Sequence, residues 1–154
     1  MNDVRTWILG EEQAVSFLKK KGFKIVEKNC KIGGSEIDIV AILPKSVQKR
    51  QIIGNFKERK FDSLSDKRFF HKAIISEIKE LQDMWVFVEV KARSSKKFGE
   101  PFEAVGRGKQ HNLERGVFFY LKKNNHKNLP FRIDVVSVVD DEITHIENAV
   151  NASV

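Results

Sequence analysis

Apolar side chains near the start of the chain recur with the period of a helix. On one side of residues 10–21, at spacings of three and four, lie Ala14, Val15, Phe17 and Leu18. Gly22 follows directly, and glycine is the residue most often found just past the end of a helix. The pattern therefore predicts a helix over 10–21 with one face toward a core.

Three later segments have the composition of β-strands. Residues 23–30 and 35–42 flank Gly33-Gly34, and paired glycines supply the positive φ that a tight hairpin requires. Residues 84–91 are dense in β-branched and aromatic side chains, which favour strands. These features predict a β-hairpin followed, after a long interval, by a third strand.

The second half of the chain adds a helix and two strands. An apolar stripe at helical spacing, in a region that Pro101 can open, consists of Leu113, Gly116, Val117, Tyr120 and Leu121. Residues 131–139 are a strand candidate, almost continuously apolar from Val135, and 143–146 are a short last one. Such apolar strands are typical of a sheet covered on both faces. The predicted fold is α/β, with a mixed central sheet flanked by helices in the order α-β-β-β-α-β-β.

The length of 154 residues fits a single domain. Residues 44–83 form a basic insertion within this domain. Between 44 and 80 the chain has ten Lys or Arg and five Asp or Glu, so this part carries +5 of the net charge. Four aromatic residues interleave with these charges: Phe56, Phe61, Phe69 and Phe70. Two interpretations stay open. The segment is a surface that binds phosphates and stacks bases, or it is a solvated insertion whose phenylalanines dock on the core.

Composition and charge narrow the class of protein. The net charge is +7 and the pI about 9.5, which favours an anionic partner such as nucleic acid. The single cysteine, Cys30, excludes an internal disulfide and a cysteine-based zinc site, and it suits a reducing compartment. No apolar run approaches the roughly 18 residues of a membrane span, and the first residues lack a secretory signal. We expect a cytoplasmic protein that does not interact with membranes.

Acidic side chains interrupt two of the predicted strands. Strand alternation places Glu36 and Asp38 on one face, and it places Glu89 and Lys91 on one face of the third strand. A carboxylate buried in an apolar strand is costly unless it has a partner. Neighbouring carboxylates would also repel one another, and a hard divalent cation such as Mg²⁺ relieves both problems. The pattern predicts a metal site at which Lys91 adds positive charge or orients a nucleophile.

A further acid comes from the first predicted helix. Glu11 shares a face with Val15 and Leu18, so it should point toward the core, whereas Glu12 should point to solvent. An acid on the buried face needs a partner, and the metal cluster is a candidate.

Asp38 with Glu89-Val90-Lys91 resembles the D…ExK signature of the PD-(D/E)XK, or restriction-endonuclease-like, superfamily. A wider set of motifs, in the order seen in the YraN-like family of uncharacterised bacterial proteins, is Gly10-Glu11-x-x-Ala14, Gly34-x-Glu36-Ile-Asp38, Phe87-Val-Glu-Val-Lys91-x-Arg93, Phe98-Gly-x-Pro101-x-Glu103-Ala-Val105, Lys109, Arg132-x-Asp134-Val-Val136 and His145-Ile-x-Asn148-Ala149. The resemblance runs from residue 10 to 149, outside 44–83. One departure is that 50 residues intervene between Asp38 and Glu89, where the family has a short turn. The insertion either shields the site or extends its substrate surface.

The resemblance implies a restriction-endonuclease-like fold and a Mg²⁺- or Mn²⁺-dependent nuclease that hydrolyses phosphodiester bonds in DNA. It places the metal on Asp38, Glu89 and the backbone carbonyl of Val90, with Lys91 as the catalytic lysine and Glu11 as a further acid of the site. Residues expected to contact nucleic acid are Arg93, Lys96, Lys97, Lys109 and Gln110.

Other interpretations keep the same residues in different roles. Asp38, Glu89 and Lys91 can instead be a salt-bridge cluster in an inactive nuclease fold. Such a protein would be a nucleic-acid-binding module, or an adaptor whose basic loop docks an acidic protein. Glu36 either braces the hairpin or Arg93, or binds metal. We expect Asp134, beside Arg132, to be a structural acid, and Glu103 to cap a helix.

Overall fold

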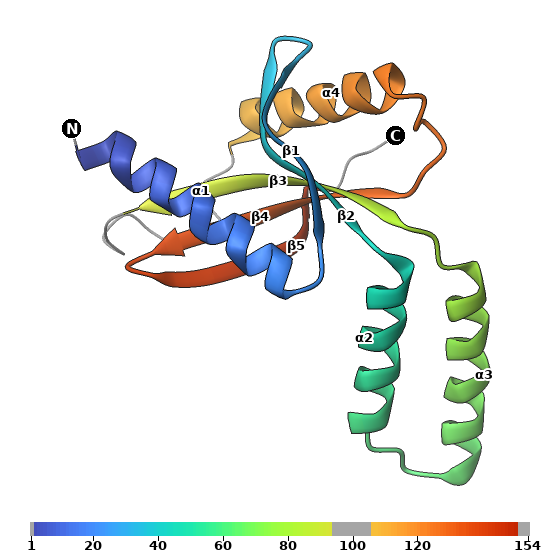
Figure 1. The fold of residues 1–154 in the computed structure, drawn as a ribbon. Helices are drawn as coiled ribbons and strands as arrows, with labels where there is room; N and C mark the ends of the chain where they lie inside the picture. The colour runs from blue at the N-terminus through green and yellow to red at the C-terminus, as the bar shows by residue number, and fades with distance from the viewer. Residues whose placement is uncertain (1, 94–105, 151–154) are drawn as a thin grey trace.

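The computed structural model describes residues 2–93 and 106–150 and confirms an α/β fold with a mixed sheet (Figure 1). Its helices are α1 (Asn2–Lys20), α2 (Lys45–Glu58), α3 (Leu64–Glu80) and α4 (Arg107–Lys123). Its strands are β1 (Lys24–Ile32), β2 (Ser35–Leu43), β3 (Met84–Arg93), β4 (Phe131–Val139) and β5 (Glu142–Val150). None of the helices in the described ranges is long and apolar enough to cross a membrane.

The five strands lie in the sheet in the order in which they occur in the chain. β1, β2 and β3 pair antiparallel, β3 and β4 pair parallel, and β5 returns antiparallel to β4. The parallel pair requires a crossover, which contains α4. Gly33 and Gly34 have φ of 58° and 74°, as the predicted β1–β2 turn requires.

Helices cover both faces of the sheet, as the apolar strands predicted (Figure 1). On one face Ala14 and Leu18 of α1 pack against alternate residues of the inner strands, namely Ile39, Ala41, Val86, Val88, Val136 and Val138. On the other face Val117, Tyr120 and Leu121 of α4 pack against Val40, Phe87 and Ile133. All five residues of the predicted α4 stripe are buried. Glu89 and Lys91 alternate with the valines that face α1, so their side chains lie on the α4 side.

The observed order is α-ββ-αα-β-α-ββ, so it differs from the predicted order by two helices in the insertion. α1 also begins at Asn2 rather than near residue 10. The part of the helix just before Gly10 does not pack on the core, because Trp7, Ile8 and Leu9 are exposed. β5 runs over nine residues rather than four. Pro101 lies outside the described residues, and the described part of the following helix begins at Arg107.

Residues 45–80 form two helices joined by a short loop, which we call the helical arm. The arm projects from the ends of β2 and β3 (Figure 1). Gln48, which is buried, fixes its base, because its Nε2 donates to the carbonyl oxygens of Leu43 at 3.0 Å and Gln82 at 2.8 Å. Since Leu43 precedes the arm and Gln82 follows it, one side chain joins the two chain segments that lead into and out of the arm.

The phenylalanines of the arm pack on one another and not on the sheet core, so the interpretation that they dock on the core is wrong. The ring centroid of Phe61 lies 5.3 Å from that of Phe56 and 5.6 Å from that of Phe70. Phe69 is 70% exposed. The arm is attached where β2 ends at Leu43 and β3 begins at Met84 (Figure 1). These positions are the strand ends farther from Asp38 and Glu89, so the arm does not shield the two acids.

Candidate active site

Asp38 lies where the pairing of β2 with β3 ends. The last paired residues are Ile39 and Val88. One step further, Asp38 Oδ2 accepts a hydrogen bond of 2.7 Å from the backbone N–H of Val90. A side-chain carboxylate thus takes the place of a ladder hydrogen bond, and it brings Asp38 beside Glu89 as the strand pattern predicted.

Glu89 is 1% exposed and binds two lysines through one oxygen. Lys91 Nζ lies 2.9 Å from Glu89 Oε1. Lys109 Nζ, from the first turn of α4, contacts the same oxygen. Burial alone would lower the pKa of Lys109, but the hydrogen bond and charge of Glu89 raise it above its usual value. The lysine therefore stays a cation at the edge of the acidic cluster.

Two carboxylate oxygens at this site are buried and have no protein partner: Glu89 Oε2 and Glu11 Oε1. The other oxygen of Glu11 accepts a hydrogen bond of 3.3 Å from Asn29 Nδ2. Burial raises the pKa of Glu11, whereas the hydrogen bond from Asn29 lowers it. Buried unpaired carboxylate oxygens are rare in folded proteins and commonly indicate an absent ion or water. Glu11 is buried and Glu12 exposed, as the helical period predicted.

Sequence reasoning missed Asn29 and the role of Gly10, which together bring Glu11 to this place. Asn29 has φ of 51°, a left-handed conformation in which asparagine is enriched. It lies between Lys28 and Cys30, which pair with residues on either side of Asp38. A Cβ at Gly10 would collide with the Cβ of Ala92, so only glycine lets α1 cross β3 this closely. An asparagine within a strand candidate was the available signal, because asparagine is depleted in strands.

Two side-chain carboxylates at this site could hold a cation. Within residues 2–93 and 106–150, no group of three or more His, Cys, Asp or Glu side chains is arranged to hold a metal ion. Mg²⁺ is usually bound through one or two carboxylates and keeps several waters. Asp38 and the unpaired oxygen of Glu89 fit that requirement, with Glu11 further out.

Asp38 is the acid whose ionisation the site changes most clearly. Burial, and then the charge of Glu89, raise the pKa of Asp38 to about 7 from its ordinary 3.8, against the hydrogen bond from Val90 N–H and the charge of Lys109. Two adjacent buried carboxylates cannot both ionise without cost in the absence of a cation. The site therefore has the electrostatics of a cation site or of a proton-sharing acid pair.

In metal-free buffer, the wild type is expected to lose folding stability as the pH rises from about 4 to about 7. Asp38→Asn is expected to remove part of that loss. Because the folded pKa is raised, the stabilisation from the protonated Asp38 is fully present below the unfolded value of 3.8 and is lost as the pH rises through about 7. Asparagine carries no charge to bury, and its Oδ1 can still accept from Val90.

Urea unfolding of both proteins from pH 4 to pH 8 in EDTA measures this effect. The unfolding free energy of the wild type minus that of the variant should fall with rising pH. A difference that does not change with pH would show that the charge on Asp38 has no such cost.

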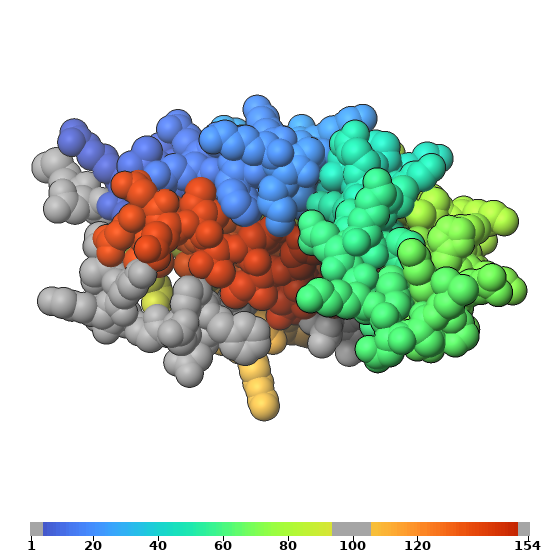
Figure 2. Space-filling model, turned by 90° about the horizontal axis from the view of Figure 1, so that it is seen from below, coloured from blue at the N-terminus to red at the C-terminus, as the bar shows by residue number. Residues whose placement is uncertain are grey.

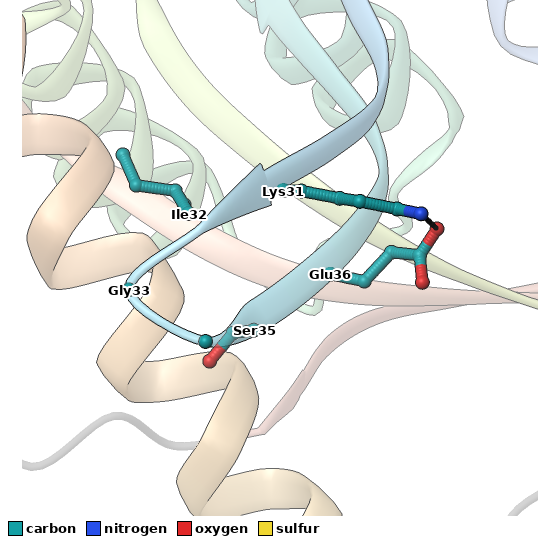
Figure 3. Close-up of a pocket in the computed structure, with 6 residues that line it drawn as sticks. Lys31, Ile32, Gly33, Ser35 and Glu36 are labelled. Atoms are coloured by element: carbon teal, nitrogen blue, oxygen red, sulfur yellow. Dashed lines mark ion pairs between the residues drawn. The ribbon is translucent and has the colours of Figure 1, made fainter.

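Glu36 is exposed and lies at the β1–β2 turn. Its carboxylate is 4.0 Å from Lys31 Nζ across the hairpin, beside an open hollow of about 410 Å³ that residues 31–36 line (Figure 3). Ser35 Oγ donates to the carbonyl oxygen of Asn112 on α4 at 2.7 Å. Of the two interpretations for Glu36, bracing the hairpin is the one that this ion pair supports.

The remaining predicted residues lie around the acids or outside the described part of the chain. Arg93 is the last residue of β3, and Gln110 follows Lys109 on α4. Lys96, Lys97 and Glu103 lie outside the described residues. Lys109, expected at a phosphate, contacts Glu89 directly. Burial raises the pKa of the Cys30 thiol to about 11, which suits a packed thiol and not a nucleophile.

Asp134 is a buried structural acid, as predicted. It is completely buried and accepts from His145 Nε2 at 2.8 Å, from Arg132 Nε at 3.2 Å and from the backbone N–H of Asn148 at 2.8 Å. Lys21 Nζ lies 2.8 Å from the other ring nitrogen of His145, so the network joins the end of α1 to β4 and β5. These contacts hold β4 and β5 together. Asp134 pairs with Val88, next to Glu89, but strand alternation places the Asp134 side chain on the face that α1 covers, opposite to the Glu89 side chain.

The chain is similar along most of its length to a set of bacterial proteins. A UPF0102 protein of Clostridioides difficile is 32% identical over 151 residues, covering 97% of this chain and 99% of that protein. A UPF0102 protein of Caldicellulosiruptor saccharolyticus is 33% identical over 148 residues, covering 93% and 92%. A third, from Thermodesulfovibrio yellowstonii, is 32% identical over 140 residues, covering 91% and 90%. Residues 10–138 match the model of the family described as uncharacterised protein family UPF0102, and the chain belongs to that family.

Proposed function

We propose that this protein is a Mg²⁺- or Mn²⁺-dependent nuclease that hydrolyses phosphodiester bonds in DNA. The observation that carries the proposal is the completely buried Glu89, which leaves Oε2 unpaired beside Asp38 while Lys91 lies 2.9 Å from Oε1. Two carboxylates and a lysine on adjacent strands supply the groups that metal-assisted hydrolysis of a phosphodiester needs. The resemblance to PD-(D/E)XK nucleases adds support from the same residues.

Each side chain has a distinct part in the proposed reaction. Asp38, the unpaired oxygen of Glu89 and the carbonyl of Val90 would hold the cation. When bound, the cation supplies Lewis acidity toward water and the phosphate oxygens. Lys91 orients the attacking water and stabilises the negative charge that develops on the phosphate. Water adds to phosphorus, the P–O ester bond breaks and the leaving oxygen takes a proton.

The second candidate is a nucleic-acid-binding module without catalysis. It is favoured by the same Glu89, because Lys91 and Lys109 already neutralise one of its oxygens without any metal. In that case, Glu89, Lys91 and Lys109 form a structural ion-pair network, and the exposed basic residues of the protein still bind phosphates. Binding of this kind should weaken with salt and survive both EDTA and Lys91→Ala.

Lys91→Ala is expected to reduce Mn²⁺-dependent DNA cleavage by at least about 100-fold, the usual range for removing a group that assists proton transfer or charge stabilisation. Purified wild type and variant are incubated with labelled single-stranded, duplex and branched DNA, in Mn²⁺ or in EDTA. The matched control is Lys19→Ala, which removes an exposed lysine of α1.

Cleavage that needs metal and disappears only in Lys91→Ala supports the nuclease. Equal cleavage by wild type and Lys91→Ala would indicate a contaminant or a wrong assignment of the lysine. Binding without cleavage in every condition would favour the second candidate. Absence of binding at low salt would favour an adaptor for an acidic protein.

A further inference from the structure

We propose that the helical arm binds the phosphate backbone of nucleic acid at a point no more than about 12 base pairs from the acidic site. The inference assigns the proposed nuclease a second contact surface for the same substrate. The position of the arm relative to the cleavage site rests on the proposed function. The arm is the green lobe at the right-hand end of Figure 2 and projects from the sheet in Figure 1.

The first support is charge. All ten basic side chains of residues 44–80 are exposed, against five acidic residues in the same segment. Around the tip these cations are Lys57, Arg59, Lys60, Lys67 and Arg68. Within the described part of the chain none of these five forms an ion pair, so their charges are available to a partner. Polyanionic phosphates are the complementary ligand.

The second support is that most residues of the arm do not pack against the hydrophobic core of the sheet. α2 has two buried residues, Val47 and Gln48, both in its first turn, and α3 has none. The arm is nevertheless built to hold a shape. Its tip is closed by the packed rings of Phe56, Phe61 and Phe70, and the Arg59 guanidinium lies 4.1 Å from the centroid of Phe70. An ordered element with few core residues and a cationic surface is suited to binding.

The third support is an exposed aromatic side chain among the cations. Phe69 is 70% exposed, next to Arg68 and one turn of helix from Lys72. An aromatic ring presented to solvent between cations can stack on an unpaired base while the cations bind the backbone. Phe69 should therefore strengthen the binding of single-stranded DNA more than the binding of duplex DNA.

The reach of the arm sets the spacing. Asp38 lies five residues before the end of β2, roughly 17 Å along the strand. The 14 residues of α2 add roughly 21 Å, so the tip lies at most about 40 Å from Asp38. A duplex advances 3.4 Å per base pair, so this distance corresponds to at most about 11–12 base pairs. An 8-bp duplex centred on the acids extends only about 14 Å toward the arm, less than the roughly 17 Å of β2 that separates Asp38 from the base of the arm, whereas a 30-bp duplex extends about 51 Å and covers the whole distance.

The test compares two double charge reversals that change the net charge equally. Lys60→Glu with Arg68→Glu alters the tip, and Lys122→Glu with Lys123→Glu alters exposed lysines at the end of α4. Binding to a labelled 30-bp duplex and a 30-nucleotide single strand is measured by fluorescence anisotropy in EDTA over a series of salt concentrations. The tip variant should bind at least 10-fold more weakly than the control variant. Its salt slope should be reduced by about 1.8 for the duplex and about 1.4 for the single strand, as expected for two lost phosphate contacts.

A second comparison places the arm relative to the acids. If the protein cleaves DNA, the tip variant should cleave the 30-bp duplex at least 10-fold more slowly at low substrate concentration, and the 8-bp duplex within twofold of wild type. Phe69→Ala should weaken binding of the single strand at least fivefold more than binding of the duplex. Unchanged thermal unfolding of each variant shows that the arm is still folded.

The outcomes separate this inference from the nuclease. Weaker binding by the tip variant without any cleavage would support the arm as a phosphate-binding surface and count against the nuclease. Cleavage and binding that are equal in the tip and control variants would overturn the proposal that the arm binds phosphates, but not the proposed nuclease activity. The remaining candidate partner of the arm would then be an acidic protein. Absence of nucleic-acid binding by the wild type at low salt would overturn it as well.

Discussion

Glu89→Gln is expected to abolish metal-dependent cleavage, with a loss of at least about 1,000-fold, and to remove the response of the folded protein to Mn²⁺. A divalent cation supplies several kcal/mol of transition-state stabilisation, and each 1.36 kcal/mol is a factor of ten in rate. The substitution keeps the shape of the buried side chain but removes the charge of the proposed ligand. It also leaves Lys91 and Lys109 beside an uncharged amide.

Thermal unfolding with and without Mn²⁺ gives a readout that does not depend on activity. The wild type should unfold at a higher temperature in Mn²⁺ than in EDTA, because a ligand that binds only the folded state stabilises it. The Glu89→Gln variant should show no such rise. Glu12→Gln, which removes an exposed acid one residue from Glu11, is the control and should behave as the wild type. If Mn²⁺ leaves the wild type unchanged, the cluster is a structural ion-pair network and not a cation site.

Asp134→Ala is expected to lower the free energy of unfolding by about 3–5 kcal/mol, the usual cost of removing one partner from a buried ion pair. Asp134 accepts hydrogen bonds from three groups in the network that joins α1, β4 and β5. Its removal leaves the nearly buried His145 and Arg132 without this acceptor. Arg132 Nη2 is already buried without a partner, so the network has no spare acceptor for it.

Urea unfolding of the wild type, Asp134→Ala and the exposed-site control Asp62→Ala measures this cost. The control should lie within about 0.5 kcal/mol of the wild type, as is usual for surface substitutions. A loss below about 1 kcal/mol for Asp134→Ala would show that the network contributes little to the stability of the fold. Cleavage measured well below the unfolding midpoint should be retained, because Asp134 is not part of the proposed reaction.

Local pattern was enough to locate most of the elements. The five-residue stripe of α4 and the choice of Glu11 over Glu12 follow from the helical period, since each depends only on which side of one helix is buried. The β4 bounds agree with the predicted 131–139 because its nearly continuous apolar run is buried on both faces of the sheet. The pattern failed where an element does not pack on the core. The first turns of α1 and both helices of the arm carry little or no buried stripe, so the period had little to indicate.

The candidate site was predictable in its acids but not in its partners. The acids could be located because Asp38 and Glu89 interrupt otherwise apolar strands. The structure pairs those two strands and puts Asp38 against the backbone of Val90. The contact of Lys109 with Glu89 joins residues 20 positions apart through a crossover, and that of Asn29 with Glu11 joins a strand to a helix. Neither spacing is periodic, so no local rule predicts it.

Residue type and local period set which side chains are apolar, which acids lie within strands and where the positive charge is concentrated. It is the fold that brings one oxygen of Glu89 to two lysines and leaves the other unpaired, and that makes the basic insertion an ordered arm pointing away from the acids. Burial, hydrogen-bond partners and direction in space arise from the packing of distant segments, and it is these properties that turn a set of charged residues into a candidate site.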